Sequence, residues 1–417
     1  MTSQTTFTDS ERASALLHSA AILLEVGESD IALAGLERAE GLAAGVPQIK
    51  RAHAIALAQM DRPLEAARLL LDELALAPDD GEAFRTFLGM IDRVPPISTL
   101  PKSSFFRQLL LRLDSAVERR FLGRGYGSTL QRAARYTALV LGHAPAFETT
   151  FAALADDASR DCMLEVAALV ALGDERVRLH FDEEGLEEFR ERSERELLRE
   201  RGGELGLYDL KAAGVPLRVI ATERSLAAWA HLGQYELERE GAHIGPQRGD
   251  VVIDGGGGLG DTALWFAHRA GASGQVFSFE IDPQRCEVFR QNLALNPWTQ
   301  GRVDLVPEAL AARSGPGPAS GGPPLRSVDD FVAARGLERV DFLKLDVDGA
   351  EAEALAGAEK TLARFRPRLA IAVHFRPEDL AVIPARLLGM GLGYRIFLGQ
   401  YAPGAWETTL FAVSDYQ

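Results

Sequence analysis

The chain has 417 residues, too many for one ordinary domain, and its 47% hydrophobic and 25% charged residues are typical of a globular protein. Its net charge of −15 disfavours nucleic acid as the main partner, and its two cysteines, Cys162 and Cys286, disfavour a disulfide framework or a thiolate metal site. No run of about 18 apolar residues predicts a membrane span and the polar first residues lack a signal core, so we expect a cytoplasmic protein.

Residues 1 to about 200 are predicted to be helical, because apolar residues recur at spacings of three and four. Two segments within residues 14–80, VGESDIALAGLERA and MDRPLEAARLLLDE, align with an offset of 34 positions. That period is typical of tetratricopeptide repeats. A further first helix begins at GEAFRTFLGMI and stops at Pro95-Pro96. The sequence therefore predicts a tetratricopeptide-like helical domain, with an ordinary Ala/Leu-rich bundle as the alternative.

A densely charged segment, residues 182–204, is predicted to form an exposed connecting helix that ends at Gly202-Gly203. We place the domain boundary there, which gives a helical domain over residues 1–203 and a second domain over residues 204–417. The second domain is predicted to alternate strands with helices.

Nine segments of the second domain have the length and apolar character of strands. They are 204–210, 216–222, 250–255, 275–280, 303–307, 340–346, 368–375, 394–399 and 408–413. Buried strands separated by helices predict an α/β fold with a parallel sheet covered on both faces. The last two strands are joined by a short loop, QYAPGAWE, which predicts a hairpin at the C-terminal edge.

The segment VVIDGGGGLGDTAL, residues 251–264, places a bare loop between a strand and a helix. Gly255, Gly257 and Gly260 fit the pattern G-x-G-x-x-G, in which missing side chains let a ligand touch the backbone. Glu280 follows at the end of the next strand, where an acid accepts hydrogen bonds from ribose hydroxyls. The combination predicts a nucleoside ligand, either a dinucleotide such as NAD or S-adenosylmethionine.

Three features favour S-adenosylmethionine. Asp254 directly precedes the glycines, where an anion suits the ammonium end of S-adenosylmethionine and is poorly placed beside a pyrophosphate. The predicted C-terminal hairpin matches a seven-stranded methyltransferase sheet whose last strand is antiparallel. The acid-rich block KLDVDGAEAE, residues 344–353, ends the fourth core strand, where an acceptor would meet the methyl group.

Four segments, VVIDGGGGLGDTALWFA, FSFEIDP, ERVDFLKLDVDGAE and RPRLAIAVHFRPEDL, in this order resemble the FkbM-type methyltransferases over about residues 204–417. The resemblance implies a class I, Rossmann-like fold with a seven-stranded, mostly parallel sheet, and O-methylation of sugars or natural products. The family loop often reads D-x-G-A-N-x-G, whereas Gly257 and Gly258 stand here for Ala and Asn. The family block often reads K-x-D-x-E-G-A-E, whereas Asp348 stands here for Glu.

The cofactor residues that we expect lie at the ends of the first four core strands. They are Asp254, Gly255, Gly256, Gly258, Gly260, Glu280, Ile281, Glu308, Ala309 and Asp346. Asn296 and Glu308 lie near the third strand, where an adenine would be bound, although packing explains them equally well. Tyr235 is a further candidate for the edge of the cofactor pocket.

Lys344 and Asp346 are two positions apart on one strand and share a face at its C-terminal end. We expect Asp346 to act as a base or to orient the acceptor, with Lys344 setting its charge; alternatively, Lys344 pairs with Asp346 or Glu351 to cap the strand. His374 ends the next strand and is either a second candidate base or a hydrogen-bonded structural residue. Asp348 and Glu351 either contact an acceptor or a divalent ion, or simply favour the start of a helix.

The sequence also narrows the acceptor. It lacks the Asn/Asp-Pro-Pro-aromatic motif of amine-directed nucleic-acid methyltransferases and a Pro-Cys nucleophile for cytosine chemistry. We therefore expect a hydroxyl of a small molecule or glycan as the acceptor, with the helical domain docking a protein partner or the acceptor. Two alternatives stay open, namely an NAD-binding oxidoreductase and a scaffold in which only the repeats bind.

Overall fold

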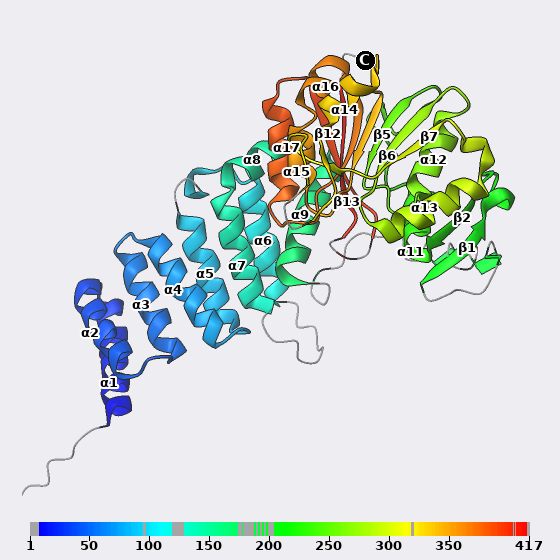
Figure 1. Cartoon of the computed structure of the whole chain (residues 1–417). Helices are drawn as coiled ribbons and strands as arrows, with labels where there is room; N and C mark the ends of the chain where they lie inside the picture. Colours follow the sequence, from blue (N-terminus) through cyan, green and yellow to red (C-terminus); the bar gives the residue numbers. More distant parts are fainter. Residues whose placement is uncertain are drawn as a thin grey trace, which may run out of the picture. The chain divides into compact units, whose positions relative to one another are not determined.

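The computed structural model describes residues 8–94, 97–118, 129–173, 177, 187–188, 191, 194–195, 197–198, 204–317, 321–402, 404 and 406–414. The chain forms two compact units, Met1–Glu148 with Leu164–Arg178, and Thr149–Met163 with Leu179–Gln417 (Figure 1). The stop at Pro95-Pro96 and most of the charged helix predicted over 182–204 lie outside the described residues. The domain boundary near Gly203 stays a prediction. Among the described helices, none has both the length and the apolar character needed to cross a membrane.

The N-terminal part of the chain is helical, as predicted. Its helices are α1 Asp9–Glu25, α2 Ser29–Leu42, α3 Pro47–Gln59, α4 Pro63–Leu76, α5 Gly81–Arg93, α6 Phe105–Glu118, α7 Thr129–Gly142, α8 Ala144–Ala153 and α9 Asp157–Leu172. Helix α4 begins and ends 34 positions after α2, and both follow a left-handed residue, Gly27 (φ 84°) and Asp61 (φ 59°). The 34-residue period is therefore seen in the helix bounds, while the tetratricopeptide assignment stays a prediction.

The second unit is built on a seven-stranded sheet with the order β12-β13-β11-β10-β5-β6-β7, in which β13 runs antiparallel to the other six strands. Its strands are β5 Val251–Gly255, β6 Gln275–Phe279, β7 Val303–Val306, β10 Phe342–Leu345, β11 Arg368–Ala372, β12 Tyr394–Gln400 and β13 Thr408–Ser414. The predicted fold class is confirmed. The last strand of the hairpin lies between β11 and β12, so that β12 forms the edge.

Helices cover both faces of this sheet (Figure 1). They are α12 Asp261–Ala270, α13 Pro283–Leu295, α14 Val328–Arg335, α15 Glu351–Ala356, α16 Glu359–Phe365 and α17 Asp379–Gly389. On one face, the ring of Phe266 in α12 lies 5.6 Å from that of Phe342 in β10. On the other face, the ring centres of Phe331 in α14 and Phe277 in β6 lie 5.2 Å apart. Both faces of the central strands are therefore buried, as continuous apolar strands require.

The first two predicted strands lie outside this sheet. They form a separate antiparallel pair, β1 Leu205–Asp209 and β2 Arg218–Thr222. Asn292 of α13 and Asn296, the residue that follows this helix, bind β2 through their side-chain amides. Asn292 accepts from the N–H of Ile220 (2.7 Å) and donates to its carbonyl (2.9 Å), and Asn296 does the same at Arg218 (3.0 and 2.7 Å). Asn296 is thus a structural residue, in line with the packing alternative.

Two short strand pairs were not predicted. Strands β3 Leu237–Arg239 and β4 Ala242–Ile244 form a hairpin whose two turn residues, Glu240 and Gly241, both have positive φ. Strands β8 Ala309–Leu310 and β9 Leu325–Arg326 form a two-residue parallel pair on either side of the Gly/Pro-rich segment. Segments of two or three residues are too short for an apolar period to be visible.

The outer edge of β12 is covered by the turn between α8 and α9. Leu154 forms a parallel bridge with Ile396, and the N–H of Ala155 donates to the Ile396 carbonyl at 2.8 Å. The N–H of Leu398 donates to the hydroxyl of buried Ser159 at 2.9 Å. The segment Thr149–Met163 is therefore part of the unit that contains the sheet.

We expect Ser159→Ala to lower the free energy of unfolding by about 1–3 kcal/mol, because it leaves the buried N–H of Leu398 without an acceptor. Chemical denaturation followed by tryptophan fluorescence measures this loss. Ser273→Ala, at an exposed serine of the same unit, serves as the matched control. Equal stability of the two variants would contradict the role given to Ser159.

Candidate functional site

A row of buried polar residues crosses the centre of the sheet. Ser278 of β6, Asp254 of β5 and Lys344 of β10 are neighbours in register. Asp254 Oδ2 accepts from the Ser278 hydroxyl at 2.7 Å, and Lys344 Nζ lies 3.1 Å from Asp254 Oδ1. The ion pair of Lys344 is therefore with Asp254, and the alternative that paired it with Asp346 or Glu351 is wrong.

Lys344 is buried and remains charged. Burial lowers its pKa, but the carboxylates of Asp254 and Asp346 outweigh burial and raise the pKa above its ordinary value. Nζ also donates to the carbonyl of Gly256 at 2.6 Å. The ammonium group of Lys344 thus fixes the position of Gly256 at the start of the glycine loop.

The glycine loop requires glycine where it turns. Gly256 has φ 81°, and a Cβ there would lie 1.8 Å from the backbone oxygen of Asp346. Gly260 has φ 83°, is the N-cap residue of α12, and packs against the ring of Phe289 so closely that a Cβ would lie 2.3 Å away. Gly258 also has positive φ (53°), but nothing lies within 4 Å of its Cβ position. The loop is therefore closed on its inner side and open at Gly258.

Glu280 follows β6 and is tied to the loop. Its carboxylate accepts from three backbone N–H groups, those of Gly258 (2.8 Å), Ile281 (2.7 Å) and Asp282 (2.8 Å). Only 4% of Glu280 is exposed, and that part faces a cavity. A carboxylate can accept about four hydrogen bonds, so Glu280 is oriented by the backbone and keeps capacity for a ligand.

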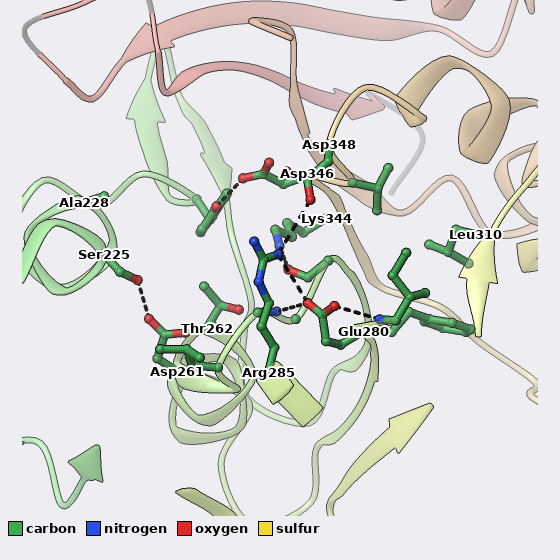
Figure 2. A pocket seen from close by; sticks show the side chains of 18 of the residues that line it. Ser225, Ala228, Asp261, Thr262, Glu280, Arg285, Leu310, Lys344, Asp346 and Asp348 are labelled. Carbon is green, nitrogen blue, oxygen red and sulfur yellow. Dashed lines mark hydrogen bonds and ion pairs between the residues drawn. The ribbon is translucent and has the colours of Figure 1, made fainter. Parts of the chain in front are cut away.

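The cavity has a volume of about 430 Å³ and lies at the carboxyl ends of the strands (Figure 2). Seven of the ten expected cofactor residues line it, namely Gly256, Gly258, Glu280, Ile281, Glu308, Ala309 and Asp346, and so do the further candidates Lys344, Tyr235 and Asp348. Asp254, Gly255 and Gly260 lie outside its lining. Asp254 is fully buried by the polar row, so its carboxylate acts on the cavity through Lys344 and the loop.

Asp346 and Tyr235 are joined at one wall of the cavity. The Tyr235 hydroxyl donates to Asp346 Oδ2 at 2.7 Å, and Lys344 Nζ lies 5.2 Å from the centre of the tyrosine ring. Burial, together with the charge of Asp346, raises the pKa of Tyr235 well above its ordinary value. Tyr235 therefore stays protonated and holds the carboxylate of Asp346 in one orientation.

The other predicted catalytic group, His374, lies outside the cavity lining. Its Nδ1 is 3.2 Å from the carbonyl of Thr408, and its ring packs against Phe375 and Trp406. Glu351 is buried at the start of α15 and accepts from the N–H of Val347 at 2.7 Å, as expected for an acid at a helix start. Within the described residues, no group of three or more His, Cys, Asp or Glu could hold a metal ion.

Several lining residues escaped the sequence analysis. Glu407 precedes β13 in left-handed backbone (φ 66°) and accepts from Gln234 (2.6 Å) and Arg224 (3.1 Å). Asp261, at the start of α12, accepts from the Ser225 hydroxyl and from Trp229 Nε1 (2.9 Å). The positive φ at Glu407 shows only in the fold, so the sequence carried no signal for it. Arg285 is another lining residue of this kind.

The family model of the methyltransferase FkbM domain matches residues 241–396. The resemblance drawn from the sequence motifs is therefore confirmed for this segment. No curated protein matches the chain.

Three solved structures are similar to the chain. The methyltransferase FkbM from Methylobacillus flagellatus KT has 20% identity and a TM-score of 0.45, with 67% of this chain and 62% of that protein covered. Fibrillarin from Aeropyrum pernix with bound S-adenosyl-L-methionine has 16% identity, 52% and 96% coverage and a TM-score of 0.29. An O-methyltransferase from Bacillus cereus in complex with SAH has 16% identity, 57% and 93% coverage and a TM-score of 0.30. The chain thus spans less than two thirds of the first, and the fold assignment rests on its own strand order.

We expect Gly256→Ala to destabilise the protein by about 3 kcal/mol or more, because its Cβ meets backbone that cannot move away. Gly258→Ala shares the positive φ without the clash and should cost only about 1 kcal/mol. Thermal and urea unfolding of the two variants measure the difference. Equal losses would mean that backbone strain alone, and not close approach to Asp346, determines the requirement at Gly256.

Proposed function

We propose that this protein, whose residues 241–396 carry an FkbM methyltransferase domain, uses S-adenosylmethionine to methylate a hydroxyl group of a sugar, glycan or natural product. The observation that supports the proposal best is the cavity at the strand ends. It brings the bare glycine loop, Glu280 and Asp346 together around one space. A cleft at the carboxyl ends of the strands is where open α/β sheets bind ligands.

The residues present fit S-adenosylmethionine. The loop at Gly256 and Gly258 offers backbone without side chains, and Glu280 offers a carboxylate that suits two ribose hydroxyls. Ile281 is half exposed although apolar, which suits the flat face of a base. Glu308 and Ala309 follow β7 on the same side of the cavity. When bound, the cofactor supplies a methyl group activated by a sulfonium.

We place the methyl acceptor at the part of the cavity wall that Asp346 and Tyr235 form. Asp346 is half-buried and held by the Tyr235 hydroxyl, so one carboxylate oxygen is oriented and the other is left to accept a proton from a hydroxyl. The Gln234 amide and the Glu407 carboxylate line the same region and offer further polar contacts to a hydroxylated acceptor. Asp346 is therefore proposed as the base that takes the proton of the acceptor hydroxyl, because His374 does not line the cavity.

Two alternatives are weaker. In an NAD-binding oxidoreductase the glycine loop would face a pyrophosphate, but the antiparallel β13 between β11 and β12 and the FkbM family match favour methyl transfer. A scaffold would need neither Glu280 nor Asp346 at a cavity. The helical N-terminal part is proposed to dock the acceptor or a protein partner.

We expect calorimetric titration to show binding of S-adenosylhomocysteine and no binding of NAD. Glu280→Ala should weaken S-adenosylhomocysteine binding by about 10- to 100-fold, because charge-assisted hydrogen bonds to the ribose are lost. Glu280→Gln preserves the shape if Glu280→Ala fails to fold. Glu287→Ala, at an exposed acid of α13, is the control and should bind as the wild type does. Binding of NAD alone would overturn the proposal.

We expect Asp346→Asn to lower the rate of methyl transfer by about 100-fold or more while S-adenosylhomocysteine binding changes little. The amide keeps the shape of the side chain but cannot take the acceptor proton. Transfer of a radiolabelled methyl group to a panel of hydroxylated acceptors, compared between wild type and variant, measures the effect. Unchanged transfer by the variant would exclude Asp346 as the base.

A further inference from the structure

Arg285 lies between two acidic residues in the lining of the cavity. It lies in the first turn of α13, and its side chain, 50% exposed, lines the cavity between Glu280 and Asp348 (Figure 2). Its Nη1 lies 3.9 Å from Glu280 Oε2 on its own side and 3.6 Å from Asp348 Oδ2 on the opposite side. The guanidinium thus connects two segments that approach the cavity from different strands.

Asp348 is presented by the loop between β10 and α15. Its backbone is left-handed (φ 53°) and is followed by left-handed Gly349 (φ 94°). Aspartate tolerates this conformation better than most side chains, which gives a physical reason for Asp in place of the Glu common in the family. Its side chain is 75% exposed, so the loop holds a charged group at the rim of the cavity and not in its floor.

Arg285 differs from the two other cations in the described lining of the cavity. Lys344 is buried and bound to Asp254 and the glycine loop, and Arg224 pairs with Glu407. Both contacts of Arg285 are longer than a hydrogen bond, so the guanidinium takes up no lone pair of Glu280. Its ion pairs can therefore open and re-form without disturbing the hydrogen bonds that orient Glu280.

We propose that Arg285 and Asp348 form an ion-pair gate over the nucleoside end of the cavity, which opens to admit the cofactor and closes over it. The proposal rests on the proposed use of S-adenosylmethionine. A planar guanidinium suits this place because it pairs with a carboxylate and also lies flat on a base. The pair positions the cofactor and retains the product, so it sets the rate at which S-adenosylhomocysteine leaves.

Stopped-flow dissociation of S-adenosylhomocysteine from the full chain tests the gate. Arg285→Ala and Asp348→Asn should each speed dissociation by about threefold, the scale of a half-exposed ion pair. The double variant should be no faster than the faster single variant, because either change removes the same pair. Arg290→Ala is the matched control, since Arg290 lies on the same helix, is 56% exposed and pairs locally with Glu287. Arg285→Lys keeps the charge and should restore part of the slow release.

The outcomes separate the gate from the function on which it rests. If the wild type does not bind S-adenosylhomocysteine, the proposed function and the gate both fail. If the wild type binds and the Arg285 and Asp348 variants release at its rate, the gate alone is overturned. Additive effects in the double variant, or equal acceleration by Arg290→Ala, would also overturn it. Raising the salt concentration should speed release from the wild type more than from Arg285→Ala if the pair acts by charge.

Discussion

The buried ion pair between Lys344 and Asp254 is the constraint on which the rest of the site depends. Two charges removed from water are tolerated only when they are paired and hydrogen-bonded, and breaking such a pair costs far more than its net contribution. Here Ser278, Asp254 and Lys344 form one continuous row over three strands, and Lys344 carries the row into the loop at Gly256. Glu280 then fixes the same loop from the neighbouring strand end.

The sheet and the site residues at the ends of its strands could be predicted from the sequence. All nine predicted strands exist, because short segments rich in apolar and β-branched residues mark strands, and residues at their ends, such as Glu280 and Asp346, line the cavity. The sequence did not predict the lining residues that the fold brings together from distant segments. Gln234, Glu407 and Arg285 come from a loop, a hairpin and a helix face, and nothing local in the sequence links them. His374 shows the converse, since a position at a strand end did not bring its ring into the lining.

The departures from the family pattern have local causes. A Cβ at Gly257 would lie 2.1 Å from the hydroxyl of Ser278, so the alanine common in the family cannot coexist with Ser278 in its present position. The serine uses that space to donate to Asp254. The glycine at position 257 is therefore required by the serine at position 278. Gly258 is different, because nothing lies within 4 Å of its Cβ position, so no close contact requires glycine in place of the asparagine common in the family.

Asn292 and Asn296 have a consequence beyond holding β2. An exposed strand edge invites pairing with another chain, and proteins protect such edges in different ways. Asn292 and Asn296 occupy the backbone groups of Ile220 and Arg218 with amides that imitate a neighbouring strand, and the turn at Leu154 does the same for β12. Neither leucine nor aspartate could replace these asparagines, because an amide, unlike either of them, both donates and accepts. We therefore expect the resistance of this acidic protein to aggregation to depend in part on these two asparagines.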